Sequence, residues 1–136
     1  MIKLFLDTNV LLAPILPKKK DHIYALAIVL QNRVPLFTNE YVMKECRRVL
    51  QERYVYSIAD VEKFIAFIGR KVFVTKTPSK EEFREIVMSD RSDRPIVCSA
   101  KKLGCVLVTE DRATLHEADR YVVAVSCSVA VKNLAL

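Results

Sequence analysis

The sequence predicts an α/β protein, a three-layer α/β/α sandwich around a central and mainly parallel β-sheet. Two observations favour this fold class. Short apolar runs alternate along the chain with longer segments whose apolar residues recur at helical spacing. Several of the short runs are apolar at almost every position, which is typical of strands covered by helices on both faces of a sheet.

Five segments are expected to form the strands of this sheet. The first carries a single charge, at Lys3, and the others are short and mainly apolar. In chain order, the predicted strands are residues 2–6, 35–37, 71–74, 106–109 and 121–125.

Helical segments separate the predicted strands. Apolar residues that recur every three or four positions predict helices in residues 23–30, 42–50, 61–68, 83–87 and 96–100. Pro95 fits the first turn of the last of these helices. Gly69 and Gly104 stand where a helix would end and a strand begin, so both are expected to be left-handed C-terminal caps.

The composition indicates one domain with a sizeable core. The chain has 136 residues, 51% of them hydrophobic, and we expect residues 1–136 to fold together. No apolar run is long enough to span a bilayer, and the N-terminal residues lack the pattern of a signal peptide. We therefore expect a cytoplasmic protein that does not bind membranes. The four cysteines are far apart in the sequence, so we expect core thiols rather than disulfides or metal ligands.

The formal net charge is +6 at pH 7, and the sequence pI is about 9.2. This excess favours polyanionic partners, although proteins that never bind nucleic acid also carry such charges. The densest basic runs are Lys18 to Lys20, Arg47 with Arg48, and Arg91 with Arg94. Each run by itself is also explained as solvated surface.

Two aspartates follow directly after predicted strands. Asp7 ends "LFLD" and Asp111 ends "CVLVTED". Because the carboxyl ends of parallel strands meet at one edge of the sheet, where ligands bind in open α/β folds, both carboxylates are expected at that edge. Helix capping is the alternative: Thr8 or Asn9 could cap a helix through residues 10–12, and Asp111 could cap the helix that follows it.

Two further acids are expected near the same edge. Asp93 stands at the start of the helix that contains Pro95, where it could also be a capping residue. Glu45 falls within the apolar stripe of the helix over residues 42–50, and a carboxylate there is unfavourable unless something binds it. Pairing with Arg48, or extension from the margin of the stripe, is the alternative.

Together the four acids indicate a metal site. Carboxylates that converge repel one another and raise one another's pKa values, so a divalent cation is needed to neutralise them. Oxygen ligands of this kind suit Mg²⁺ or Mn²⁺. We therefore predict Mg²⁺ or Mn²⁺ as the cofactor.

The sequence resembles the PIN domain family, the nuclease fold of VapC-type toxins, over nearly its whole length. Four stretches carry the resemblance, and each contains one acid: "LFLDTNVLL", "FTNEYVMKECRRVL", "SDRSDRPIVCSAKKLG" and "CVLVTEDRATL". The resemblance implies that four acids bind the metal and that two polar residues support them in catalysis. The metal-binding residues are then Asp7, Glu45, Asp93 and Asp111, and the supporting residues are Asn9 and Thr109.

Two positions depart from the family pattern or leave a choice. Glu110 stands where the family usually has a small residue or Asn. Asp90 is an alternative to Asp93 as the third acid. We prefer Asp93 because it directly precedes the helix start "RPIV".

The resemblance implies a Mg²⁺- or Mn²⁺-dependent endoribonuclease that cleaves RNA, the toxin of a type II toxin–antitoxin pair. A small antitoxin partner and a homodimer are further expectations. One alternative is a PIN-like module that binds RNA or protein without cleavage. Another is a phosphatase of the haloacid dehalogenase type, which needs a second aspartate where this chain has Asn9. A receiver domain is disfavoured because no lysine closely follows the strand at residues 121–125.

Overall fold

A parallel β-sheet forms the centre of the molecule. The computed structural model describes residues 1–16 and 22–136. The strands lie in the order β3-β2-β1-β4-β5, and each neighbouring pair is parallel. Their bounds are β1 (Leu4–Leu6), β2 (Leu36–Asn39), β3 (Phe73–Thr75), β4 (Val106–Val108) and β5 (Ala124–Val125). Each predicted strand overlaps one of them, so the predicted α/β fold class is confirmed.

β1 is the central strand, and all three of its residues are buried. Leu4 is opposite Leu36 of β2 on one side and Val106 of β4 on the other. An interior position of this kind favours an entirely apolar strand because neither face meets water. Since the three strands are parallel, their carboxyl ends meet at one edge of the sheet.

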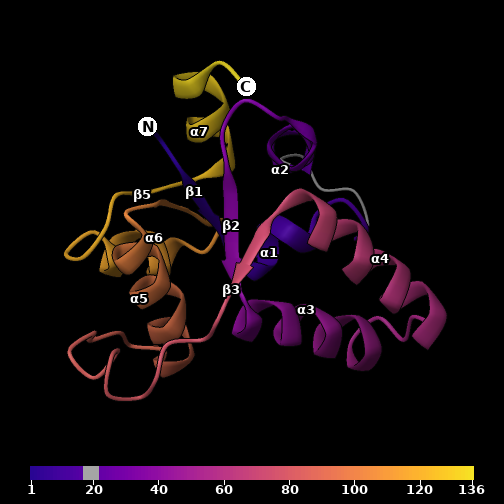
Figure 1. Cartoon of the computed structure of the whole chain (residues 1–136), viewed down its shortest axis with the longest axis horizontal. Helices are drawn as coiled ribbons and strands as arrows, with labels where there is room; N and C mark the ends of the chain where they lie inside the picture. Colours follow the sequence, from indigo (N-terminus) through magenta and orange to yellow (C-terminus); the bar gives the residue numbers. More distant parts are fainter. Residues whose placement is uncertain (17–21) are drawn as a thin grey trace.

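Helices cover both faces of the sheet, as Figure 1 shows. On one face lie α1 (Thr8–Leu12), α2 (His22–Leu30), α3 (Glu40–Glu52) and α4 (Ile58–Lys71). On the other lie α5 (Arg94–Leu103), preceded by the 3₁₀ turn η1 (Arg91–Asp93), and α6 (Arg112–Ala118). The last helix, α7 (Cys127–Leu134), packs against α2.

The core contains the side chains of β1 and the inner faces of the surrounding helices. All four cysteines are buried, as the sequence predicted. Burial raises the pKa of the Cys46 thiol, which keeps it a neutral core group. Within the described residues, no helix is both long and apolar enough to cross a membrane.

The predicted helix at residues 83–87 is wrong. The segment forms turns, in which Phe83 N–H donates to Ser79 O and Ile86 N–H donates to Phe83 O. Ser79 and Glu82 bond to each other's backbone N–H groups as a helix-starting pair does, but no regular helix follows. Phe83 and Ile86 are nevertheless buried, so their spacing reflects two anchors in the core rather than a helical face.

The two glycines differ in conformation. Gly104 has φ +67° and caps the end of α5, as predicted. The prediction for Gly69 is wrong because α4 continues through it to Lys71 and ends at Val72, which has an extended backbone. Gly69 is exposed within the last turns of the helix, where its missing side chain costs no packing.

Val55 lies shortly after the end of α3 in a conformation that valine rarely adopts. Its φ is +53°, and its side chain is 80% exposed. The turn is closed by the Tyr56 N–H, which donates to Leu50 O, in the pattern of a left-handed helix C-terminus. A left-handed backbone costs a residue with a β-carbon about 1–2 kcal/mol, so this turn is under strain.

Val55→Gly should stabilise the protein. Glycine relieves the strain of the left-handed backbone, and after its larger loss of chain entropy a gain of up to about 1 kcal/mol should remain. Thermal melting of the variant measures this gain. Val87→Gly is the matched control, because Val87 is also exposed but has no positive φ. This control should melt lower than wild type, and a Val55→Gly variant that also melts lower would contradict the interpretation.

Candidate functional site

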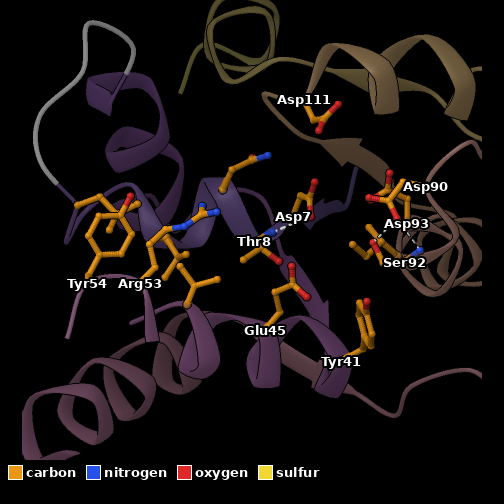
Figure 2. Close-up of a pocket in the computed structure, with 15 residues that line it drawn as sticks. Asp7, Thr8, Tyr41, Glu45, Arg53, Tyr54, Asp90, Ser92, Asp93 and Asp111 are labelled. Carbon is orange, nitrogen blue, oxygen red and sulfur yellow. Dashed lines mark hydrogen bonds between the residues drawn. The ribbon is translucent and has the colours of Figure 1, made fainter. Parts of the chain in front are cut away.

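The candidate site lies where the chain leaves the sheet at the carboxyl ends of β1 and β4. After β1 the chain enters α1 on one face, and after β4 it enters α6 on the other, which makes this the crossover point of the sheet. A cavity of about 370 Å³ opens there. Carboxylates from separate parts of the chain line it (Figure 2): Asp7, Glu45, Asp90, Asp93 and Asp111. The structure thus brings all four predicted acids to one cavity.

Asp7 is the most deeply buried of these acids, with 6% of its surface exposed. Its Oδ1 accepts a hydrogen bond from Thr8 N–H at 2.7 Å, and its Oδ2 accepts one from the Thr109 hydroxyl at 2.7 Å. Asp7 is therefore itself the N-cap of α1. The expectation that Thr8 or Asn9 caps this helix is wrong, because both residues lie inside its first turn.

Thr109 and Asn9 connect the end of β4 to the end of β1. The fully buried Thr109 hydroxyl donates to Asp7 and accepts from Asn9 Nδ2 at 3.3 Å and from Asp111 N–H at 3.2 Å. These three bonds use the full capacity of a hydroxyl group. Asn9 Oδ1 also accepts from Glu110 N–H at 3.1 Å. Asn9 lines the cavity, whereas Thr109 holds Asp7 from within the core.

Thr114 of α6 links the two aspartates on the other side of the cavity. Asp111 caps α6, since its Oδ1 accepts from Thr114 N–H at 3.0 Å. The capping alternative is therefore confirmed for Asp111. For Asp93 that alternative is wrong: it occupies the N-cap position of α5 without a side-chain bond to the helix. Its Oδ2 instead accepts from the Thr114 hydroxyl at 3.2 Å.

Glu45 reaches the cavity from the margin of the buried face of α3. Its side chain is 32% exposed, and its Oε1 lies 3.8 Å from Arg48 Nη2. An ion pair this exposed contributes little to stability. The helix presents residues four apart to the cavity, so Glu45 has a line of cavity-lining neighbours on its own helix. The line consists of Tyr41, Glu45, Val49 and Arg53.

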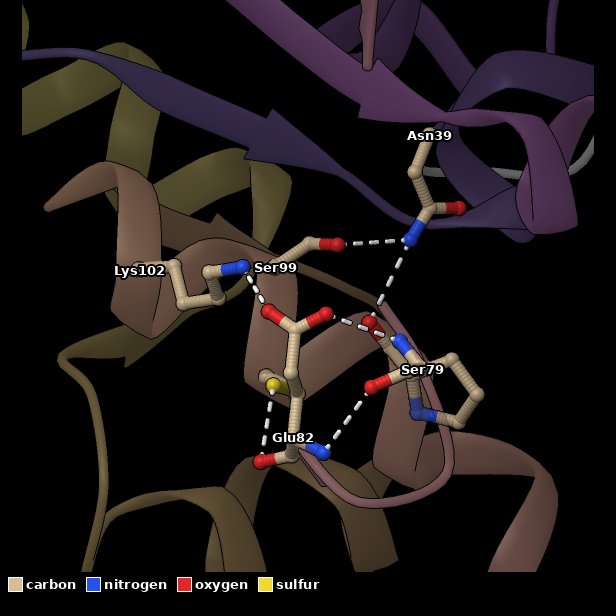
Figure 3. Close-up of polar contacts among 7 residues, drawn as sticks. Asn39, Ser79, Glu82, Ser99 and Lys102 are labelled. Carbon is tan, nitrogen blue, oxygen red and sulfur yellow. Dashed lines mark hydrogen bonds and ion pairs between the residues drawn. The ribbon is translucent and has the colours of Figure 1, made fainter. Parts of the chain in front are cut away.

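Asn39 fixes α3 relative to α5. It is fully buried at the end of β2, and its Oδ1 caps α3 by accepting from Val42 N–H at 2.9 Å. Its Nδ2 donates to Ser99 Oγ at 2.8 Å and to Pro95 O at 3.2 Å, both in α5 (Figure 3). One side chain therefore ties the helix that carries Glu45 to the helix that begins at Asp93.

The segment before α5 is fastened to the same helix. Glu82 forms an ion pair with Lys102 of α5 and accepts from the backbone of Ser79 at 3.0 Å (Figure 3). Cys98 of α5 lies 3.5 Å from the carbonyl oxygen of Glu82. These contacts fix the turn segment against the helix that Asp93 begins.

The carboxylates of the cavity disfavour one another's charge. Burial raises the pKa of Asp7, and the nearby Asp111 and Glu45 carboxylates add to this shift, while the bond from Thr109 opposes it. Burial and the carboxylates of Asp7 and Asp90 raise the pKa of Asp93 to about 6. Without a cation, the ionised site therefore destabilises the fold.

The comparisons with known proteins identify the family. The pattern of the PIN domain matches residues 3–113. The chain belongs to the PIN domain family. No curated protein matches it closely enough to count as a relative.

Solved structures have the same fold as this PIN domain at low sequence identity. PAE2754 from Pyrobaculum aerophilum has a TM-score of 0.71 at 17% identity, over 98% of this chain and 96% of that one. VapBC2 from Rickettsia felis, bound to a DNA fragment from its promoter, has a TM-score of 0.69 at 13% identity. The match covers 93% of this chain and 98% of that one. VapBC-1 from nontypeable Haemophilus influenzae has a TM-score of 0.65 at 18% identity, and the match covers 94% of this chain and 99% of that one.

The PIN domain's cavity also contains residues that the sequence reasoning did not assign to it. Asp90 was named only as an alternative to Asp93, and both line the cavity. Two hydrogen bonds from Ser92 lower the pKa of Asp90, whose side chain is exposed, whereas Asp93 is half-buried. Asp93 thus lies in the less solvated position. Tyr41, Arg53 and Tyr54 also line the cavity. Tyr41 is four residues before Glu45 and Arg53 is eight residues after it, and this helical spacing is the sequence feature that could have indicated both of them.

The basic residues named from the sequence lie elsewhere. Arg47 forms an ion pair with Glu62 at 2.9 Å, and Arg94 stacks over the ring of Phe83 at 5.1 Å. Arg91 is exposed and does not line the cavity. The run Lys18 to Lys20 lies outside the described residues.

The donors in the cavity fit a divalent cation by residue type. They are hard carboxylate oxygens, joined by the Thr8 hydroxyl, which is buried and lacks a hydrogen-bond partner among the described residues. In the present side-chain positions, the described part of the chain has no group of three His, Cys, Asp or Glu residues placed to hold one ion. The repelling carboxylates would therefore have to turn toward a cation that several of them share.

Asn39→Asp should destabilise the protein by about 3 kcal/mol. Aspartate keeps the cap of α3, but it cannot donate to Ser99, and its charge would be buried against the Pro95 carbonyl oxygen. Urea unfolding measures the loss. Ser57→Ala is the control, because Ser57 caps α4 at an exposed position and should cost only about 1 kcal/mol. Equal losses in the two variants would show that the link to α5 contributes nothing.

Asp93→Asn should stabilise the metal-free protein, and the gain should depend on pH. The folded-state pKa of about 6 lies above the ordinary value of 3.8, so ionisation of Asp93 reduces stability as pH rises through this interval. Above it the variant should gain about 1 kcal/mol, allowing for screening of a half-buried group, and the gain should vanish toward pH 4. Thermal melting of the wild type and the variant with chelator, across this pH range, measures the gain in stability. Asp119→Asn, at an exposed site, should show no such trend.

Proposed function

We propose that this PIN domain is a Mg²⁺- or Mn²⁺-dependent endoribonuclease that cleaves RNA phosphodiester bonds. The observation that carries the proposal is the convergence of acids from β1, α3, α5 and the end of β4 on one cavity at the crossover point of the sheet. Such a cluster is unfavourable by itself, as the raised pKa of Asp93 indicates. A site that costs stability and collects hard oxygen ligands is suited to a divalent cation.

In this proposal, Asp7, Glu45, Asp93 and Asp111 hold the metal. A bound Mg²⁺ or Mn²⁺ would make a water molecule more acidic and offset the negative charge that develops on the phosphate oxygens. Asp7 is held in one orientation by Thr8 and Thr109. Asn9 lines the cavity beside it and can hydrogen-bond a substrate phosphate or a water, while it keeps the ends of β1 and β4 together.

The proposal extends to a toxin–antitoxin pair. The chain has the fold of VapBC proteins from Rickettsia felis and Haemophilus influenzae over more than nine-tenths of its length. By this similarity, we propose that the protein is the toxin of a type II pair with a small antitoxin as its partner. A homodimer is a further part of the proposal and rests only on the sequence resemblance to VapC-type toxins. We propose that residues 1–136 act as one nuclease domain in that pair.

Asp7→Asn should abolish metal-dependent cleavage and keep the fold. Asparagine has nearly the same shape, and its single side-chain oxygen can still accept the bond from the Thr8 amide, but its NH₂ group cannot accept from Thr109 and it lacks the charge that a cation needs. Total RNA is incubated with each purified protein in Mg²⁺, Mn²⁺ or chelator. We expect at least a hundredfold loss of cleavage, since a metal ligand is removed.

The matched control is Asp119→Asn, the same change at an exposed position outside the cavity. It should cleave like wild type. Melting curves with and without Mn²⁺ report metal binding separately, and the rise in melting temperature of wild type should be much smaller in Asp7→Asn. Equal cleavage by wild type and Asp7→Asn would point to a contaminating nuclease. Binding of RNA and Mn²⁺ without any cleavage would favour a non-cleaving module.

A further inference from the structure

The cavity has a second end whose chemistry differs from that of the acids. Arg53 and Tyr54 line it, on the far side of Glu45 from Asp93 (Figure 2). Along α3, the apolar side chain of Val49 lies between Glu45 and Arg53, and Leu12 and Leu16 line the cavity as well. The cavity therefore passes from a negatively charged end, over an apolar middle, to a basic and aromatic end.

The geometry of α3 separates these ends by a fixed distance. Glu45 and Arg53 are eight residues apart on the same face of the helix, which corresponds to about 12 Å along its axis. Among the described residues, Glu45 lies near Arg48 and forms no ion pair with Arg53. Val49 lies between them on the same face and belongs to the apolar middle of the cavity.

Arg53 is available to bind an anion. The other arginines of α3 have carboxylate partners, Arg47 with Glu62 and Arg48 with Glu45 and Glu52. Among the described residues, no carboxylate forms an ion pair with Arg53, although five carboxylates line the same cavity. A guanidinium group in such a position suits a phosphate, which it can bind through two parallel hydrogen bonds.

The turn that carries Arg53 and Tyr54 is held on both sides. The Tyr56 N–H donates to Leu50 O, which closes the end of α3, and the Tyr56 hydroxyl donates to Ile15 O at 3.1 Å, across the cavity wall. The strained backbone of Val55 lies between Tyr54 and Tyr56. Strained residues that the surrounding structure holds in place are often found at binding sites. Tyr54 is 37% exposed and lines the cavity, so we expect that a flat ligand can stack on its ring.

We propose that this end of the cavity binds the nucleotide next to the scissile phosphate of a single-stranded RNA. Arg53 binds the neighbouring phosphate, and the base stacks on Tyr54 above the apolar middle of the cavity. This proposal rests on the proposed function, which places the scissile phosphate at the acidic end. Because a base stacked in a duplex cannot also stack on a tyrosine, the site selects unpaired RNA.

The test measures the affinity for a fluorescein-labelled single-stranded RNA of about eight nucleotides by fluorescence anisotropy. All proteins carry Asp7→Asn, so that the probe stays intact in Mg²⁺. Arg53→Gln should weaken binding about fivefold and reduce the slope of log affinity against log salt by about 0.7, the value for one phosphate contact in a single strand. Arg70→Gln, which changes an exposed arginine outside the cavity, should alter neither quantity.

Tyr54 is tested by a pair of substitutions. Tyr54→Ala should weaken binding about tenfold without changing the salt slope, and Tyr54→Phe should keep wild-type affinity because phenylalanine retains the stacking surface. A duplex of the same sequence should bind equally to both variants. Melting temperatures of all the variants verify that each is folded.

Some results would overturn the proposal. The first is equal affinity and equal salt slope in Arg53→Gln and Arg70→Gln. The second is equal affinity in Tyr54→Ala and Tyr54→Phe. The third is that the Arg53 and Tyr54 variants bind RNA unchanged but lose binding of a protein partner. Failure of the proposed function is distinguishable, because it appears as absence of cleavage by the protein with Asp7 intact. If cleavage is absent but RNA affinity depends on Arg53 and Tyr54 as described, the binding site stands and the nuclease assignment falls.

Discussion

The carboxylate of Asp7, buried at the end of the central strand, is the constraint on which the rest of the site depends. A charge in this position is unfavourable unless donors surround it. The structure supplies two donors, the first amide of α1 and the hydroxyl of Thr109. Thr109 can act only because β4 is the parallel neighbour of β1 and ends beside it. The pairing of these two strands thus determines both the centre of the sheet and the orientation of Asp7.

The other acids are arranged around Asp7 at increasing exposure to solvent. Asp93 is half-buried and Asp111 is exposed, and each comes from a different element. Because they repel Asp7 and one another, the fold must hold their elements together by other means. Asn39 joins α3 to α5, and Thr114 joins α6 to Asp93. Hydrogen bonds from neutral side chains therefore stabilise an arrangement of charges that is unfavourable without a cation.

α3 contributes to the site along most of its length. One face of this helix packs on the core, and the adjacent line from Tyr41 to Arg53 faces the cavity. The helix places a carboxylate near the acidic centre and a guanidinium two turns away. Because the helix is rigid, the distance between the backbone positions of these two residues is set by the sequence spacing. This combination suits the cavity to the proposed cation at one end and the proposed phosphate at the other.

The sequence by itself determined the fold class, the five strands and the four acids that reach the cavity. Each of these depends on local patterns: apolar runs, acids directly after strands, Pro95 in the first turn of a helix and Gly104 at the end of one. The prediction failed at residues 83–87, where the apolar spacing arose from two core anchors, and at Gly69, where α4 runs on to Lys71.

Only the tertiary structure decided how the residues of the site contact one another. The bond from Thr109 to Asp7 joins residues 102 positions apart, and the bond from Asn39 to Ser99 spans 60. Arg53 and Tyr54 line the cavity at the end of α3, and Tyr56 joins this end to Ile15. No local pattern specifies such partners, since they depend on which strands are neighbours and how the helices cross over the sheet. Local patterns predicted which acids lie near the ends of strands and helices. Strand order and helix packing determined that these acids meet in one cavity, and which neutral groups hold their elements together.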